Sequence, residues 1–361
     1  MGRVKKVVHI VPGLIPGECG LGDYAVKLAR EFEKSAIGSR FVVAGRELRH
    51  RAAEYDSTGP FTVNVVDDDL PSSLVAALDA EDSDVVILHF SGYGYHRSGY
   101  PRWVAEAIKT YRRAGKAKVI TFFHESWQSP KLLSRRVYLW LLQRDVVRRL
   151  CASSDHIVTN TEQRAHLLHR FHSQGCKAIP VFSSVGEKPE AKNKEADLAV
   201  VFGLSRTRAE AWKYIENNDQ LLGRLGVKRL IDIGPAYFPV SESLRKRVEF
   251  KGRLAEADVS SILSRARFAF IFYDANDLGK SSVFNAYAAH RLCVVNLGGN
   301  GGGESDSLRE GDHFYQAQRL LGHEGIVVES ERVSGNLADW YVPHGVSAHA
   351  ALFVSLIEGW A

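Results

Sequence analysis

Short apolar runs rich in β-branched residues alternate along the chain with longer stretches of helical period. The first such run, 7–11, is followed by a glycine-rich turn and an amphipathic stretch over 23–34. This alternation is typical of βαβ units with a parallel sheet. In the first half it predicts further strands at 41–44, 85–90, 119–123 and 156–159, and helices at 102–114, 130–150 and 162–171.

The second half of the chain repeats the same alternation. It predicts strands at 198–202, 229–233, 248–251, 268–272 and 293–296, and helices at 209–222, 257–264, 281–290 and 347–360. The polar segment 186–195 between the halves has no apolar period and is the best linker candidate. We therefore expect a first domain at 1–186 and a second at 187–344, with a terminal helix near 345–361 packing back on the first.

Composition fits this division, because 361 residues with 45% hydrophobic and 25% charged residues suit two globular domains. The chain has no apolar run near the ~20 residues of a membrane span. The run 7–11 is too short for a signal peptide, so a cytoplasmic location is expected. The four cysteines lie far apart and predict neither a disulfide framework nor a metal site.

The net charge of +5 suits an anionic ligand. Because the chain has no basic tract with interleaved aromatic residues, nucleic acid is not an expected partner. The basic residues of the helix 130–150 allow weak peripheral contact with an anionic membrane surface. A solvated helix face is the alternative interpretation.

Two glycine-containing turns are candidate phosphate sites. Gly20, Leu21 and Gly22 precede a helix that we expect to begin near Asp23, although a simple tight connection explains them equally well. The segment 280–283 lies between a strand and a helix, and it joins a lysine to good N-cap residues. It comprises Lys280, Ser281, Ser282 and Val283. The spacing is not that of a P-loop, and a capped helix with a solvated lysine is the alternative.

Other polar residues follow predicted strands. Arg206 and Arg208 could reach phosphate oxygens, with Lys213 further along the helix, or simply begin a solvated helix. His124 directly follows the strand 119–123 and could contact a sugar or move a proton. The rings of the loop tyrosines Tyr93 and Tyr95 could carry a sugar or merely pack. The glycine-rich segment 298–304 is expected to form a mobile loop.

In its motifs and their order the chain resembles glycosyltransferase family 4, in particular a divergent bacterial member. The stretch 20–24 is similar to the G-G-x-G loop of the family, and 154–162 resembles the segment that closes the N-terminal domain. The stretch 250–254 looks like the family's F-x-G strand, and 288–295 resembles its passage from helix to strand after the donor motif.

This resemblance implies an α/β fold of GT-B architecture, with two Rossmann-like doubly wound domains facing each other across a cleft. It implies transfer of a hexosyl group from a UDP- or GDP-sugar to a hydroxyl on a glycan, a lipid-linked acceptor or a small molecule. The reaction is expected to be retaining and to need neither metal nor cofactor. Catalytic roles fall on His124, Lys280 and Arg206. By the same resemblance, the donor is assigned to the stretches 20–22 and 281–283, to Arg208 and Lys213, and to Gly252, Arg253 and Leu254. The acceptor is assigned to Asp23, Tyr93, Tyr95 and Glu125, and the loop 298–304 is expected near the nucleotide.

One departure from the family pattern affects the donor site. Counting back from Val294 places Leu278 and Ala286 where the family has two glutamates in an E-x7-E pattern. Asp274 or Asp277 could replace a lost carboxylate. The departure leaves two rival hypotheses open, a catalytically decayed module that binds glycan or scaffolds a partner, and a nucleotide-sugar epimerase or hydrolase on the same fold.

Overall fold

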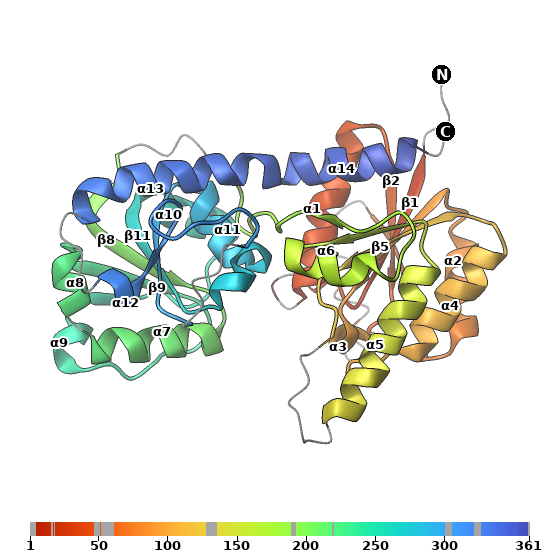
Figure 1. The fold of residues 1–361 in the computed structure, drawn as a ribbon, viewed down its shortest axis with the longest axis horizontal. Coiled ribbons are helices and arrows are strands. Elements are labelled where there is room, and N and C mark those ends of the chain that lie inside the picture. Colours follow the sequence, from red (N-terminus) through yellow and green to blue (C-terminus); the bar gives the residue numbers. More distant parts are fainter. Residues whose placement is uncertain are drawn as a thin grey trace. The chain divides into compact units, whose positions relative to one another are not determined.

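The computed structural model describes residues 5–15, 17, 19–46, 51, 61–127, 136–188, 193–218, 220–299, 305–320 and 326–359. Parts of five predicted segments lie outside these residues, namely 130–135 of the long helix, 189–192 of the linker, 219 of the helix at 209–222, 300–304 of the glycine-rich loop and 360–361 of the terminal helix. The chain divides into two compact units. The first is Met1–Ile179 with His349–Ala361, and the second is Pro180–Ala348 (Figure 1).

The first unit contains a parallel sheet in the order β3-β2-β1-β4-β5-β6-β7. Because β1 lies between β2 and β4, the chain winds first to one side of β1 and then to the other, as in a doubly wound fold. The strands are β1 (Lys6–Val11), β2 (Gly38–Val43), β3 (Thr62–Val65), β4 (Val85–Phe90), β5 (Lys118–Phe123), β6 (His156–Thr159) and β7 (Lys177–Ala178).

Helices cover both faces of this sheet (Figure 1). On one face α1 and α14 pack together, with Phe32 against Phe353. On the other face α2, α4 and α5 surround the larger apolar cluster. The helices of this unit are α1 (Gly20–Lys34), α2 (Pro71–Ala80), α3 (Gly92–Tyr95), α4 (Arg102–Arg113), α5 (Arg136–Ala152), α6 (Glu162–His169) and α14 (Val346–Glu358).

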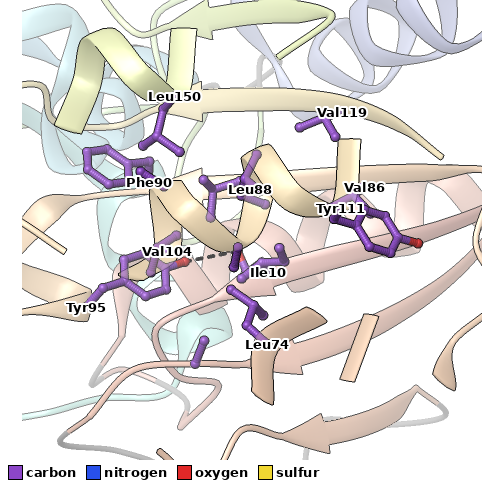
Figure 2. Close-up of a cluster of buried hydrophobic side chains, with 14 of the residues drawn as sticks. Ile10, Leu74, Val86, Leu88, Phe90, Tyr95, Val104, Tyr111, Val119 and Leu150 are labelled. Carbon is purple, nitrogen blue, oxygen red and sulfur yellow. Dashed lines mark hydrogen bonds between the residues drawn. The ribbon is translucent and has the colours of Figure 1, made fainter. Parts of the chain in front are cut away.

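Alternate residues of the central strands build the core between the sheet and these helices. Ile10 and Leu88 point into the apolar cluster of Figure 2, and both are fully buried. Tyr95 lies in the same cluster and donates hydrogen bonds from its hydroxyl to the carbonyl oxygens of Ile10, at 3.1 Å, and His89, at 2.9 Å. The short helix α3 is thereby anchored on the carboxyl ends of β1 and β4.

The second unit repeats the doubly wound order around β8, in a parallel sheet β10-β9-β8-β11-β12-β13. Its strands are β8 (Glu195–Phe202), β9 (Arg229–Ile233), β10 (Val248–Phe250), β11 (Ala266–Ile271), β12 (Cys293–Asn296) and β13 (Tyr315–Gln316). Its helices are α7 (Ser205–Asn217), α8 (Gln220–Arg224), α9 (Glu242–Arg245), α10 (Glu256–Arg265), α11 (Ser282–Ala289), α12 (Ala317–Leu320) and α13 (Ile326–Tyr341), with short 3-10 turns η2 (Ala275–Lys280) and η3 (Val342–His344).

The α/β class and the two parallel sheets predicted from the sequence are confirmed, while several helix ends differ. Helix α1 begins at Gly20, because the Cys19 sulfur caps it by accepting a hydrogen bond from the Gly22 amide at 3.4 Å. The helix predicted at 209–222 is two helices, since α7 ends at Asn217 and α8 starts at Gln220.

In the described part of the chain, no helix is both long enough and apolar enough to cross a membrane. Three basic residues of α5 are engaged within the unit. Arg148 and Arg149 both pair with Asp145, Arg149 also reaches Glu106, and Arg144 lies over the Trp140 ring. Peripheral membrane contact through this helix stays a prediction.

Candidate functional site

A cavity of ≈190 Å³ opens in the second unit between the carboxyl ends of β8 and β11. These two strands flank the point at which the strand order reverses, which is where open α/β sheets bind their ligands. Most of the described residues that line the cavity are apolar, and none of them carries a carboxylate. The lining residues are Val201, Phe202, Leu204, Thr207, Arg208, Ala211, Phe270, Ile271, Phe272, Tyr273, Lys280, Ser281, Ser282 and Val283.

The rim of this cavity combines a lysine with the start of α11. Ser281 is the N-cap, and its hydroxyl oxygen accepts a hydrogen bond from the Phe284 amide at 3.2 Å. The amides of Ser282 and Val283 are in the first turn and therefore have no acceptor within the helix. Lys280 places its ammonium 5.9 Å from the centre of the Tyr273 ring and 2.7 Å from an Asp277 carboxylate oxygen. A lysine beside orphan amides is typical of an anion site, and in this structure Asp277 is the partner of that lysine.

Gly203 lets the backbone turn away from β8 beside this site. Its φ of +134° lies in a region that side-chain-bearing residues rarely adopt, and a Cβ here would lie 3.3 Å from a Val283 methyl carbon. The glycine therefore allows the β8–α7 turn to pack directly on the first turn of α11.

Arg208 lines the cavity, but its guanidinium is engaged by the protein. It donates to both carboxylate oxygens of Asp232 and to the carbonyl oxygens of Pro235 and Ala236. Both partners of the ion pair are only 1% exposed, and the Trp212 indole N–H also donates to Asp232 at 2.6 Å. These contacts give Arg208 a role in holding the 235–236 loop, whereas the sequence predicted a contact with phosphate.

Five other residues of the second unit that were predicted for the donor do not line this cavity. The side chains of Arg206 and Lys213 are exposed on α7. Gly252, Arg253 and Leu254 follow β10, which is the outer strand of the sheet, and the Gly252 carbonyl oxygen accepts a hydrogen bond from the Gly234 amide at 2.8 Å. The structure thus brings together only Lys280, the segment 281–283 and Arg208 from the predicted donor set.

The positions of the missing glutamates are filled by apolar side chains. Leu278 and Ala286 are both 0% exposed. Asp274 caps the turn η2 by accepting a hydrogen bond from the Asn276 amide at 3.0 Å, and Asp277 pairs with Lys280. Neither aspartate lines the cavity.

In the first unit, the glycine-rich turn forms the start of α1. A Cβ on Gly22 would lie 2.1 Å from the Gly13 carbonyl oxygen, so only glycine fits where the helix crosses the end of β1. The Asp23 carboxylate accepts hydrogen bonds from the Gly17 amide, the shorter at 3.1 Å. The close approach explains the glycine by packing, while a ligand contact at Gly20 and Leu21 stays a prediction.

The predicted acceptor residues differ in exposure. Tyr93 is 45% exposed, and its hydroxyl accepts a hydrogen bond from the Gln143 side chain at 3.1 Å. Glu125 is exposed and accepts a hydrogen bond from the Ser91 hydroxyl at 2.7 Å. Tyr95 is 0% exposed and packs in the core (Figure 2), so the prediction that its ring carries a sugar is wrong.

His124 follows β5, and side chains from just after β6 and from α6 hydrogen-bond to its backbone. Its carbonyl oxygen accepts hydrogen bonds from the Asn160 side chain, at 2.8 Å, and from Arg164, at 3.0 Å. Thr161 caps α6, which carries Arg164. The segment 154–162, singled out in the sequence as a motif, therefore supports His124.

The His124 ring is 8% exposed and lies edge-on to Tyr24, with the ring centres 4.9 Å apart. Burial, with smaller contributions from His349 and Arg164, lowers the pKa of His124 to about 3. Burial also lowers the pKa of His9, on β1, to about 3. Both imidazoles are therefore neutral at pH 7.

We expect the first unit to lose stability as the pH falls from about 6.5 towards 3. In the unfolded chain these histidines titrate near the ordinary pKa of about 6.5, so in this window the unfolded state binds more protons than the folded state. Unfolding temperatures measured between pH 7.5 and 4.5 should fall, and His9→Phe should reduce that dependence. If the unfolding temperature fell equally steeply with pH in the wild type and in the variant, this explanation would be contradicted.

Sequence reasoning missed several residues of the candidate site. Tyr273 follows β11 and faces Lys280, and Asp232 carries the buried ion pair. Tyr273 could have been found from its place directly after an apolar strand. Asp232 lies inside a strand with apolar neighbours. A single acidic residue in such a strand predicts a buried partner, but the sequence does not identify that partner.

Comparison with known proteins bears on the fold of the whole chain. No known family profile matches the sequence, and no curated protein matches it. The structure is similar to that of TarM, with a TM-score of 0.65, 10% identity and 98% of each chain covered.

Two further solved structures are similar. An α-glucosyltransferase in complex with UDP and a 13-mer DNA has a TM-score of 0.62 and 10% identity, covering 99% of this chain and 100% of that one. The lipopolysaccharide outer core galactosyltransferase WaaB has a TM-score of 0.61 and 12% identity, with 99% and 100% covered. The chain therefore has the GT-B fold that these glycosyltransferases share.

Proposed function

We propose that the protein is a glycosyltransferase that transfers a hexosyl group from a nucleoside diphosphate sugar to an acceptor hydroxyl. The observation that carries this proposal is the cavity at the switch point of the second unit, with Lys280 and the first turn of α11 at its rim. A diphosphate is the ligand class that this combination of charge and orphan amides suits best. Two solved structures similar to this chain are complexes with UDP, which makes UDP the first nucleotide to test.

In this mechanism the second unit stabilises the leaving group. As the glycosidic bond breaks, negative charge develops on the diphosphate, and the Lys280 ammonium and the amides of Ser282 and Val283 stabilise it. Donors fixed in place before the reaction stabilise that charge without reorganising. Metal independence is part of the proposal, with these groups of the protein stabilising the leaving group. Retention of anomeric configuration remains part of the same proposal.

The acceptor is assigned to the first unit, where Tyr93 and Glu125 are exposed beside the carboxyl ends of β4 and β5. We place His124 towards a substrate hydroxyl because it lies at the same edge of the sheet. The acceptor's class is open within the hydroxyl-bearing glycans, lipid-linked sugars and small molecules. The exclusion of nucleic acid as a partner stays a prediction.

A thermal-unfolding screen against UDP, GDP, ADP, TDP and CMP tests the donor part of this proposal. A ligand that binds only the folded state stabilises it by about 2.7 kcal/mol at a hundredfold excess over its Kd. We expect UDP or GDP to raise the unfolding temperature, and CMP, which has no diphosphate, to have little effect. No shift with any nucleoside diphosphate would contradict donor binding.

A second candidate is a decayed module that binds the nucleotide without turnover. The buried apolar residues Leu278 and Ala286, at the positions of the family's glutamates, favour it. Incubation of the protein with the UDP- or GDP-sugar of the stabilising nucleotide, followed by mass spectrometry of the acceptor mixture, separates the two. A hexosylated product supports the transferase, whereas nucleotide binding with an intact donor supports the decayed module.

A further inference from the structure

Four polar residues form a diagonal line across one face of the sheet in the first unit. They are Ser39 on β2, His9 on β1, His89 on β4 and His124 just after β5. In the register, Val7 pairs with Ser39, His9 with Ile87, and His89 with Phe122. Each step along the line therefore moves one strand across and two residues along. Because side chains alternate between faces, all four share one face.

Hydrogen bonds join these residues into a continuous chain. His9 Nδ1 lies 3.0 Å from His89 Nε2, and His89 Nδ1 lies 3.3 Å from His124 Nε2. At the other end, His9 Nε2 lies 3.4 Å from the Ser39 hydroxyl oxygen. His9 and His89 each use both ring nitrogens within the chain. His124 bonds within the chain through Nε2, which leaves its Nδ1 at the end of the series.

The surroundings keep these rings uncharged. His9 and His89 are 0% exposed, beneath the helices α1 and α14. Aromatic rings and one further histidine cover the line, and Arg164 is the charged group that acts on His124. The covering residues are Tyr24, Phe32, Phe41, Phe122 and His349. Burial lowers the pKa of His89 well below its ordinary value, as it does for the other two rings.

A neutral imidazole has one N–H donor and one acceptor nitrogen. When neutral rings bond in series, every bond must run in the same direction, since a ring that donates at one nitrogen accepts at the other. The three histidines are then either all protonated at Nε2 or all protonated at Nδ1. In the first case His124 Nδ1 accepts a hydrogen bond, and in the second it donates one.

We propose that His9 and His89 are positioning residues for His124, which couple its tautomer to their own, so that the direction of the series decides whether Nδ1 accepts or donates a hydrogen bond. This inference rests on the proposed function, in which His124 faces a substrate hydroxyl. The Tyr24 hydroxyl bonds to Nδ1 of His349, the fourth buried histidine of this unit, at 2.5 Å. Histidines that merely fill the core have no need of this alignment.

Nitrogen-15 NMR of the imidazole rings in the wild-type full-length chain at pH 7 tests the shared tautomer directly. We expect His9, His89 and His124 to be neutral and to carry the proton on the same ring nitrogen, either Nε2 in all three or Nδ1 in all three. Mixed tautomers, or a charged ring among them, would overturn the proposal. This readout needs no turnover, so it stands even if the transferase proposal fails.

Kinetics of His89→Phe test the consequence for the reaction. Phenylalanine keeps an aromatic ring under α1 but cannot hydrogen-bond to His9 or His124. The tautomer of His124 is then no longer coupled to that of the other rings. We expect kcat to fall about tenfold to a hundredfold at an unchanged KM for the donor, and the His124 spectrum to show both tautomers. The control is Phe353→Leu, which alters packing on the same face outside the series and should leave kcat unchanged. An unchanged kcat in a folded His89→Phe would contradict the positioning role.

Discussion

Lys280→Ala is expected to weaken UDP binding by about tenfold to 150-fold. The ammonium lies at the rim of the cavity beside the first turn of α11, where it pairs with Asp277 and, in the proposed complex, also donates to the diphosphate. A hydrogen bond to a charged group contributes about 1.5–3 kcal/mol, which corresponds to this range in Kd. The loss should be measured by titration calorimetry at fixed ionic strength, because phosphate contacts are sensitive to salt.

Two matched variants make the Lys280 result specific. Lys246→Ala removes a lysine of the same unit that is 75% exposed and pairs with Glu242, and it should bind UDP as the wild type does. Lys280→Arg keeps the charge and should retain much of the affinity. Equal UDP affinity in Lys280→Ala and Lys246→Ala would show that the nucleotide is bound elsewhere.

Asp232→Ala is expected to destabilise the second unit by about 3–5 kcal/mol. Its carboxylate is 1% exposed and accepts hydrogen bonds from Arg208 and from the Trp212 indole. Removal of this partner leaves the Arg208 charge buried without a counter-ion, which costs more than the pair itself contributes. Denaturant unfolding followed by tryptophan fluorescence measures the effect, with each unit treated as its own transition.

The Asp232 prediction has two controls. Asp197→Ala removes a surface aspartate that pairs with Arg229 in the same unit, and it should destabilise the protein far less than Asp232→Ala does. The double variant Arg208→Met with Asp232→Leu removes both charges and should recover most of the lost stability. If Asp232→Ala were no more destabilising than Asp197→Ala, the buried pair would not have the structural role assigned to Arg208.

Much of the fold could be predicted because its central strands are continuous apolar runs. The strands 85–90, 156–159, 229–233 and 293–296 have the predicted bounds. What the pattern did not reveal lies at the edges and on the surface. The edge strand β3 is partly exposed throughout, and α13 contains Gly335 and several residues of weak helical propensity, so tertiary packing rather than local sequence decides these elements.

The candidate site was only partly visible in the sequence. Lys280 and the segment 281–283 were found because the N-cap and the turn after a strand are local signals. Arg208 and Tyr95 could not be placed, because whether a polar side chain faces a ligand or a buried partner depends on residues distant in sequence. The diagonal of His9, His89 and His124 needs the strand order and register, neither of which can be read from isolated histidines.

The most direct test of the proposed donor site is the structure of the protein bound to UDP. We expect the diphosphate to contact the amides of Ser282 and Val283 and the Lys280 ammonium, with the rest of the nucleotide in the cavity between β8 and β11. A diphosphate bound in the second unit away from α11, or a nucleotide bound only in the first unit, would contradict it.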